Sequence, residues 1–327
     1  MWSGVAFALM AGLMWGLVFV GPLLLPEYPA ALHTFGRYLA FGLIALPLAW
    51  FDRTELRRLS RDDWVEALKL AAVGNIFYYL FLSSAIQRAG APLPTMIIGT
   101  LPVVIAITAN LVSHQRDGRL PWGKLALPLG IILAGIACVN QAEVDELRRH
   151  GSESGGARYA VGALLAVGAV ICWTWYPIRN GRWMRAHPDR NPRAWATAQG
   201  LTTLPLALVG YAGFLLWTGV LSPSASTDTF PLPLGPRPLH FIGLMVAIGL
   251  FASWLGTLCW NAASQRLPTA LVGQLIVFET LAALLYAFLL RGSWPGALTL
   301  AGIVLLIAGV IAAVRIKPVR IKPEPVA

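Results

Sequence analysis

The chain has 327 residues, of which 57% are hydrophobic and only 12% are charged, and its mean hydropathy is +0.66. This is far more apolar surface than a soluble domain of this length can bury, so a soluble enzyme is excluded and a polytopic membrane protein is predicted. The net charge of +10 would suggest nucleic-acid binding in a soluble protein. Here the basic residues fall in loops between apolar segments, a pattern typical of membrane orientation, and we predict no nucleic-acid partner.

Ten apolar segments are long enough to cross a hydrocarbon core of ~30 Å as helices. In chain order they cover about residues 2–25, 30–50, 64–87, 91–113, 121–140, 158–178, 195–218, 239–263, 269–290 and 295–314. The first segment lacks the basic start of a cleaved signal peptide, so we expect it to stay in place as a membrane helix. The sequence therefore predicts an all-α polytopic membrane protein with ten transmembrane helices.

The first and sixth segments begin two copies of one pattern, in register at an offset of 158 residues. Trp15 of the first copy matches Trp173 of the second, and LIALPLAW at 43–50 returns as LTTLPLAL at 201–208. A Pro- and Ser-rich insertion at 221–238 then raises the offset to 178. Because five segments per copy is an odd number, the second copy must enter the membrane from the opposite side. Two inverted five-helix repeats are typical of secondary transporters.

The loops divide the chain into four parts. We predict that residues 1–140 form the first repeat and residues 158–314 the second, joined by a polar extracytoplasmic linker at 141–157. Residues 315–327 form a basic cytoplasmic tail. This orientation, with both termini in the cytoplasm, places most of the 25 Lys and Arg residues inside, as membrane proteins generally do.

Several positions carry a resemblance to a known family. They are Trp15 and Gly16 in the first segment, Arg37 in FGRYLAFGL of the second, Pro102 in GTLPVV of the fourth, and Gly130, Gly135, Gly302 and Gly309 in the fifth and tenth. With its ten segments and its repeat, the chain resembles the drug/metabolite transporter superfamily and, within it, the EamA-type transporters, over essentially its whole length. The resemblance implies a central cavity surrounded by helices one to four and six to nine, with helices five and ten outside it.

The second half departs from this family pattern. Trp195 occupies the position equivalent to Arg37. Thr280, which follows Glu279, occupies the position equivalent to Pro102. We therefore expect the polar groups of the two halves to be unequal.

Two candidate charged residues, Arg37 and Glu279, lie well inside predicted spans, where an ionisable group normally faces a partner or water. Glu279 is about 11 residues from a span end, roughly ~16 Å deep, and is a candidate for proton coupling; a salt bridge or backbone bonds would make it structural instead. Arg37 lies about seven residues from the outer end of its span. It is a candidate to bind a substrate carboxylate, or it is a structural residue that reaches toward the interface. We expect the two to be too far apart along the membrane normal for close contact.

The other candidate substrate-binding residues are an amide and several aromatic side chains. Asn75 is followed by Tyr78 and Tyr79, both of which are candidates, and one of the two tyrosines must face away because adjacent helical residues diverge by about 100°. Trp15, Trp173 and Trp254 lie too deep for an interfacial belt, so they either stack on a solute or pack between helices.

Two prolines occupy equivalent places in the two repeats. Pro47 and Pro205 each remove a backbone donor inside a predicted span and can bend it. They are candidate hinges for a rocking motion, or static kinks that shape the bundle.

Motifs for several other activities are absent from the sequence. It has no GxxxxGK[ST] loop and no HExxH pattern, and its three cysteines stand alone in apolar segments, so we predict no cofactor, no metal site and no ATP drive. A membrane enzyme would need catalytic groups that converge at one membrane face, and a sensor would need a soluble output domain. Neither is evident, so we do not expect an enzyme.

The sequence as a whole predicts a carrier of the cytoplasmic (inner) membrane that works by alternating access on a small-molecule substrate. The resemblance implies an exporter, and an amino acid or a similar amphiphilic metabolite is the first candidate. A drug or cationic-metabolite efflux carrier is the alternative, ahead of a sugar-conjugate exchanger. The sequence leaves the oligomeric state open, a homo-oligomer included.

Overall fold

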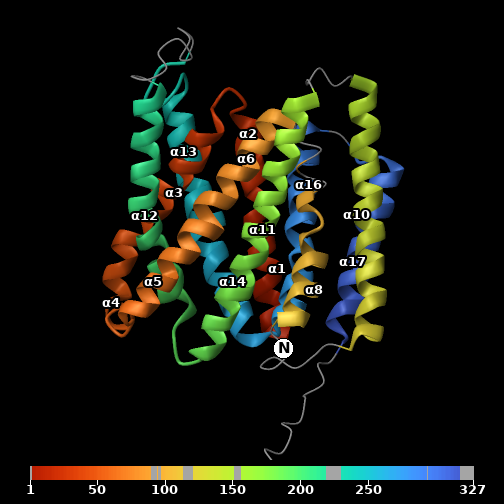
Figure 1. Ribbon diagram of the computed structural model, residues 1–327, viewed down its shortest axis with the longest axis horizontal. Helices are drawn as coiled ribbons and strands as arrows, with labels where there is room; N and C mark the ends of the chain where they lie inside the picture. The colour runs from red at the N-terminus through yellow and green to blue at the C-terminus, as the bar shows by residue number, and fades with distance from the viewer. Residues whose placement is uncertain are drawn as a thin grey trace, which may run out of the picture.

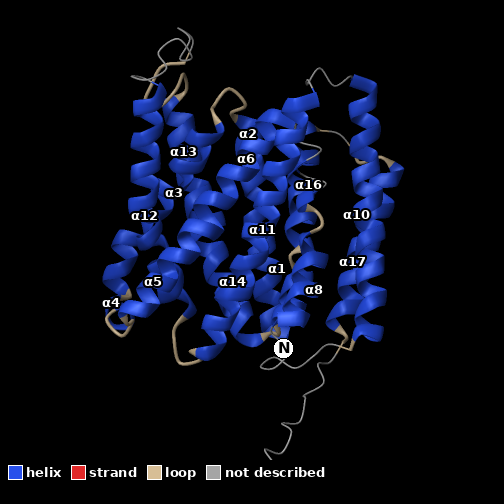
Figure 2. Ribbon diagram, viewed as in Figure 1, coloured by secondary structure: helices blue, strands red, loops and turns tan. Residues whose placement is uncertain are grey.

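The computed structural model describes residues 2–89, 94, 97–112, 121–150, 156–218, 230–292 and 294–316. Throughout this part of the chain the regular elements are helices (Figure 2). Eight helical stretches are long and apolar enough to cross a membrane, and two shorter apolar helices, Leu101–Val112 and Ala297–Ala313, occupy the places of the expected fourth and tenth spans. The prediction of an all-α polytopic membrane protein is confirmed, and each of the ten expected spans coincides with a helix.

Helical segments make up most of the described part of the chain. In chain order they are α1 (Trp2–Gly16), η1 (Leu17–Phe19), α2 (Val20–Leu24), α3 (Ala30–Phe51), α4 (Arg53–Leu56), α5 (Arg61–Leu70), η2 (Ala71–Phe77), α6 (Tyr78–Ala89), α8 (Leu101–Val112), α10 (Trp122–His150), α11 (Gly156–Ala186), α12 (Pro192–Leu216), α13 (Pro238–Ile248), η4 (Gly249–Leu255), α14 (Gly256–Arg266), α15 (Thr269–Leu275), α16 (Val277–Arg291) and α17 (Ala297–Val314). The segments η2 and η4 are π-helical turns inside the third and eighth spans. They begin at residues 71 and 249, which differ by the repeat offset of 178.

The expected linker at 141–157 is largely helical. Helix α10 continues through 141–150, and α11 begins at Gly156. The extension is helical because its sequence, QAEVDELRRH, is rich in good helix formers and contains neither Gly nor Pro. Residues 151–155, the first half of the insertion at 221–238, and the tail beyond Ile316 lie outside the described residues. The division into two repeats stays a prediction.

The helices pack in pairs that join the two halves of the chain. Helix α3 packs on α12, α6 on α11, α1 on α14, α8 on α15, and α10 on α17. Figure 1 shows that α1 begins at the lower end of the bundle, whereas α11 begins at the upper end, and that α17 ends at the lower end. It also shows α10 and α17 together at one side, beyond the other helices. This pairing is the one expected of two five-helix halves that face one another.

The α3–α12 pair is held at close range by repeat-equivalent glycines. A Cβ atom on Gly42 would stand 2.5 Å from the Cβ of Leu204, and one on Gly200 would stand 2.7 Å from the Cβ of Ala45. Small residues of this kind let membrane helices approach closely. Pro47 and Pro205 lie inside these same two helices. Their role as hinges stays a prediction.

This close approach predicts the effect of enlarging Gly200. Gly200→Val should lower the melting temperature of the purified protein, because the added side chain overpacks the α3–α12 contact at a cost of about 1–3 kcal/mol. Gly213→Val is the matched control, since Gly213 lies on the same helix with open space where its Cβ would stand. Equal melting temperatures for the two variants would contradict this account of the interface.

Candidate substrate cavity

A small enclosed cavity lies where α1, α3, α11, α16 and the two π-helical turns meet. It is lined by Trp15, Val18, Arg37, Tyr38, Asn75, Tyr78, Trp173, Ala252, Ser253, Thr257 and Glu279. Six of these residues are expected from the sequence: Trp15, Arg37, Asn75, Tyr78, Trp173 and Glu279. The cavity volume is about 10 Å³, which is room for one water molecule at most. The structure is therefore a closed form of the site.

The two π-helical turns each supply one polar side chain to the cavity. Asn75 comes from η2 and Ser253 from η4, and the two are equivalent in the repeat. Such turns widen a helix and are frequent at functional sites. The Asn75 amide donates to Thr203 Oγ1 at 3.1 Å. Ser253 was not predicted, although the repeat offset applied to Asn75 would have found it.

Aromatic side chains form one wall of the cavity. The ring of Trp173 stacks on Tyr78 at 4.6 Å and on Tyr176 at 4.9 Å between ring centres. Trp15 meets Trp173 edge-on at 5.1 Å and lies 5.0 Å from Trp260. Trp15 and Trp173, which are repeat equivalents, therefore face the cavity from opposite halves. This wall suits the apolar or aromatic part of a small molecule.

Arg37 is buried beside the cavity and is only partly satisfied by the protein. Its Nε donates to Ser253 Oγ at 2.9 Å. Its guanidinium carbon lies 4.8 Å from the ring centre of Tyr38 and 4.9 Å from that of Tyr79, within range of a cation–π interaction. Among the described residues, its Nη1 has no hydrogen-bond partner. A donor thus remains for an anionic group.

Glu279 approaches the same cavity from a broken helix. The ninth span is interrupted at Ile276, between α15 and α16, and Glu279 lies in the first turn of α16. The side chain is 6% exposed, and its Oε2 has no hydrogen-bond partner within the described part of the chain. A buried carboxylate oxygen without a partner is rare in proteins, and such groups concentrate at functional sites.

Arg37 and Glu279 line the same cavity, yet no ion pair joins these two side chains, both of which the structure describes. This agrees with the expectation that they make no close contact. The direct pairing that would have argued against a proton carrier is absent between them.

Two candidate residues lie outside the lining. Tyr79 packs over Arg37, and its hydroxyl donates to the Val18 carbonyl at 3.4 Å. Trp254 is half-buried and donates from its Nε1 to Thr197 Oγ1 at 3.2 Å. Adjacent residues therefore divide as expected, with Tyr78 in the lining and Tyr79 behind it.

The second half carries a neutral network where the first half carries Arg37. Trp195, the equivalent residue, stacks on Trp183 at 3.5 Å and donates to Asn180 Oδ1 at 2.9 Å. Asn180 in turn donates to Asn261 Oδ1 at 2.8 Å. The expected inequality of the two halves is therefore present in their contacts.

Ion pairs between the halves close the bundle at its lower end in Figure 1. Arg193 pairs with Asp52 at 2.6 Å, and the Thr197 hydroxyl donates to the same carboxylate at 2.7 Å. Arg179 binds Glu66 with two hydrogen bonds of 2.5 and 2.9 Å. We call these five residues the lower closure.

A second set of contacts closes the upper end. Arg237 pairs with Glu27 at 2.5 Å, and its backbone N–H donates to the Tyr28 hydroxyl at 2.9 Å. The ring of Tyr28 stacks on Phe241 at 4.7 Å. These four residues, the upper closure, again join the first half to the second. Contacts between the two halves therefore occur at both ends of the bundle.

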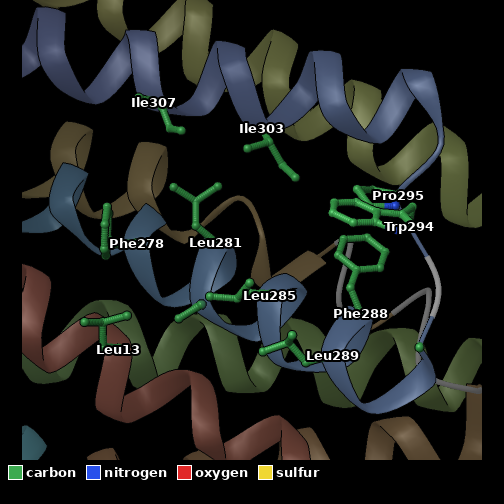
Figure 3. A pocket seen from close by; sticks show the side chains of 12 residues that line it. Leu13, Phe278, Leu281, Leu285, Phe288, Leu289, Trp294, Pro295, Ile303 and Ile307 are labelled. Atoms are coloured by element: carbon green, nitrogen blue, oxygen red, sulfur yellow. The ribbon is translucent and has the colours of Figure 1, made fainter.

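A larger groove lies on the outside of the bundle, between α16 and α17 (Figure 3). Its volume is about 640 Å³, and the described residues that line it are apolar: Leu13, Phe278, Leu281, Ala282, Leu285, Phe288, Leu289, Gly292, Trp294, Pro295, Ile303 and Ile307. Figure 3 shows Trp294 and Phe288 at one end of it. Because these side chains offer no charge, the groove is a poor site for a polar solute despite its size.

Comparison with known proteins agrees with this architecture. Residues 2–141 match the EamA-like transporter family. Inner membrane protein YtfF of Escherichia coli (strain K12) is 58% identical over 317 residues, which cover 97% of this chain and 96% of that protein. A solved crystal structure superposes with a TM-score of 0.70 over 95% of this chain and 97% of its own, at 16% identity, a likeness that concerns the fold alone. The chain therefore belongs to the EamA-like transporters of the drug/metabolite transporter superfamily.

Proposed function

We propose that the protein exports a small amphiphilic metabolite, with an amino acid as first candidate, across the cytoplasmic membrane by alternating access. The observation that carries the proposal is the small central cavity, in which Arg37 and Glu279 each keep a polar atom without a partner among the described residues, beside an aromatic wall. A cavity with one cation, one carboxylate and apolar rings fits a molecule that has both charged and apolar parts.

Alternating access is supported by the two closures. Both consist of contacts between the first and the second half of the chain, so a rocking motion of the halves breaks one closure while it keeps the other. The equivalent contacts of the paired helices support two inverted repeats that exchange their conformations. In this scheme Pro47 and Pro205 are the hinges.

The orientation and direction of transport rest on other grounds. The basic residues favour a cytoplasmic location for both termini, which makes the lower end in Figure 1 the cytoplasmic end. The name of the 58% identical relative, inner membrane protein YtfF, supports an inner-membrane location for the present protein as well. Export follows from the family resemblance.

A drug or cationic-metabolite carrier is the second candidate. It is favoured by Glu279 together with Trp15 and Trp173, because a carboxylate and indole faces can hold a cation. A sugar-conjugate exchanger is less well supported, since Arg37 is the one basic residue among the described residues that line the cavity.

Efflux from liposomes tests the proposal and the role of Arg37 together. Purified protein in liposomes loaded with a labelled amino-acid pool should release a few amino acids selectively. Arg37→Gln should slow that release about 10- to 100-fold, because a charge-assisted hydrogen bond to the substrate is lost. Arg88→Gln, at an exposed arginine, is the control. If no amino acid leaves the liposomes although the protein is folded, the substrate must be sought among drugs, cationic metabolites and sugar conjugates.

Proton coupling through Glu279 makes a separate prediction. Glu279→Gln should abolish the dependence of efflux on a pH gradient while it leaves exchange of substrate across the membrane intact, because Gln cannot carry a proton. Glu55→Gln, at the surface, should behave as the wild type. Gradient-dependent flux that persists unchanged in Glu279→Gln would show that this residue is not the coupling group.

The closures predict opposite effects on access to the cavity. With the three native cysteines replaced by Ala, a cysteine at Ala252 reports access to the cavity lining. Arg193→Gln should speed its labelling by a membrane-impermeant thiol reagent from the cytoplasmic side, and Arg237→Gln should speed labelling from the other side. The same change in both variants, or no change in either, would refute the assignment of the closures as gates.

A further inference from the structure

A second groove faces the membrane between α8 and α11, apart from the central cavity. Its volume is about 380 Å³. It is lined by Val104, Thr108 and Val112 of α8 and by Val170, Ile171, Thr174, Trp175, Ile178, Arg179 and Arg182 of α11. Apart from Arg179 and Arg182, the lining side chains are apolar or carry a hydroxyl group. The groove is therefore apolar along its length and basic at one end.

The lining residues of this groove follow the lengths of α8 and α11, so we describe it as a trough along these two helices. On α11 its lining runs from Val170 to Arg182, which is about 18 Å at the rise of an α-helix. On α8 the lining residues recur every fourth position, so they form one face of that helix. Ile171 at the open side is 64% exposed, and Val112 is 54% exposed. An extended hydrocarbon chain fits such a trough.

The basic end of the groove lies at the lower end of the bundle, where α11 ends (Figure 1). The Arg179 guanidinium is held by the Glu66 carboxylate, which compensates its charge. Arg182 donates from Nη2 to the Val112 carbonyl at 3.1 Å and has no acidic partner within the described part of the chain. Among the described residues its positive charge therefore has no carboxylate to compensate it, and it is available to an anionic headgroup.

We propose that this groove is a binding site for an anionic phospholipid, with one acyl chain in the trough and the phosphate at Arg182. Basic groups between membrane helices on the cytoplasmic side are recognised by anionic headgroups. The α16–α17 groove provides the contrast, because its described lining carries no charge and so indicates no particular occupant. The lipid site does not depend on the identity of the transported substrate.

The site is tested by lipid binding to the full-length protein after removal of native lipid in detergent. Native mass spectrometry should detect one phosphatidylglycerol that binds in preference to phosphatidylcholine. Arg182→Gln should weaken phosphatidylglycerol binding about fivefold, the effect of one basic residue near a charged lipid surface. Arg57→Gln is the matched control, because Arg57 is exposed at the same end of the bundle but outside the groove.

A second variant tests the trough independently of charge. Thr108→Phe fills the middle of the groove and should also reduce phosphatidylglycerol binding, while its melting temperature without lipid reports whether the fold is kept. Equal binding of phosphatidylglycerol and phosphatidylcholine would overturn the proposal, as would equal effects of Arg182→Gln and Arg57→Gln on phosphatidylglycerol binding. Binding of free glycerol phosphate as tight as that of phosphatidylglycerol would also overturn it. A dimer that excludes lipid from the groove would also overturn it, since the occupant would then be a second copy of the chain.

Discussion

The structure depends on the requirement that a charge within the membrane bundle must find partners inside the protein. Arg37 finds partners in both halves, because its hydrogen-bond acceptor, Ser253, belongs to the second half and its aromatic neighbours, Tyr38 and Tyr79, belong to the first. Asn75 likewise reaches across to Thr203. The cavity is therefore a property of the assembled halves, and any relative motion of the halves changes the environment of Arg37 directly.

Symmetry and asymmetry have separate consequences in this molecule. Equivalent residues do the packing: Gly42 and Gly200 let α3 and α12 approach, and Trp15 and Trp173 meet at the cavity. The charges are not duplicated. Where the first half has Arg37, the second has Trp195 within a neutral network, and such a satisfied network rigidifies its surroundings rather than offering a free donor. The residues that repeat thus determine how the helices pack, and the residues that differ between the halves supply the charged groups of the cavity.

The sequence predicted the helices and most of the cavity because both follow from local rules. Apolar length predicts a span, and depth within a span identified Arg37 and Glu279. Features that depend on tertiary geometry were missed. The ninth span breaks at Ile276, and the π-helical turn at η4 places Ser253, rather than Trp254, in the lining. Neither a break nor a π-helical turn has a reliable signature in a single sequence.

The two closures differ in strength for a physical reason. At the upper end both partners of the Arg237–Glu27 pair are substantially exposed, with side chains 45% and 34% accessible, and such pairs contribute about 0–1 kcal/mol. At the lower end the Asp52 side chain is only 1% accessible and is bound by Thr197 as well as by Arg193. Loss of a partner there leaves a buried carboxylate uncompensated, which costs several times more. From the closed form, separation of the halves at the upper end is therefore the less costly movement, and entry of water or substrate to the lower end requires that Asp52 first gain another partner.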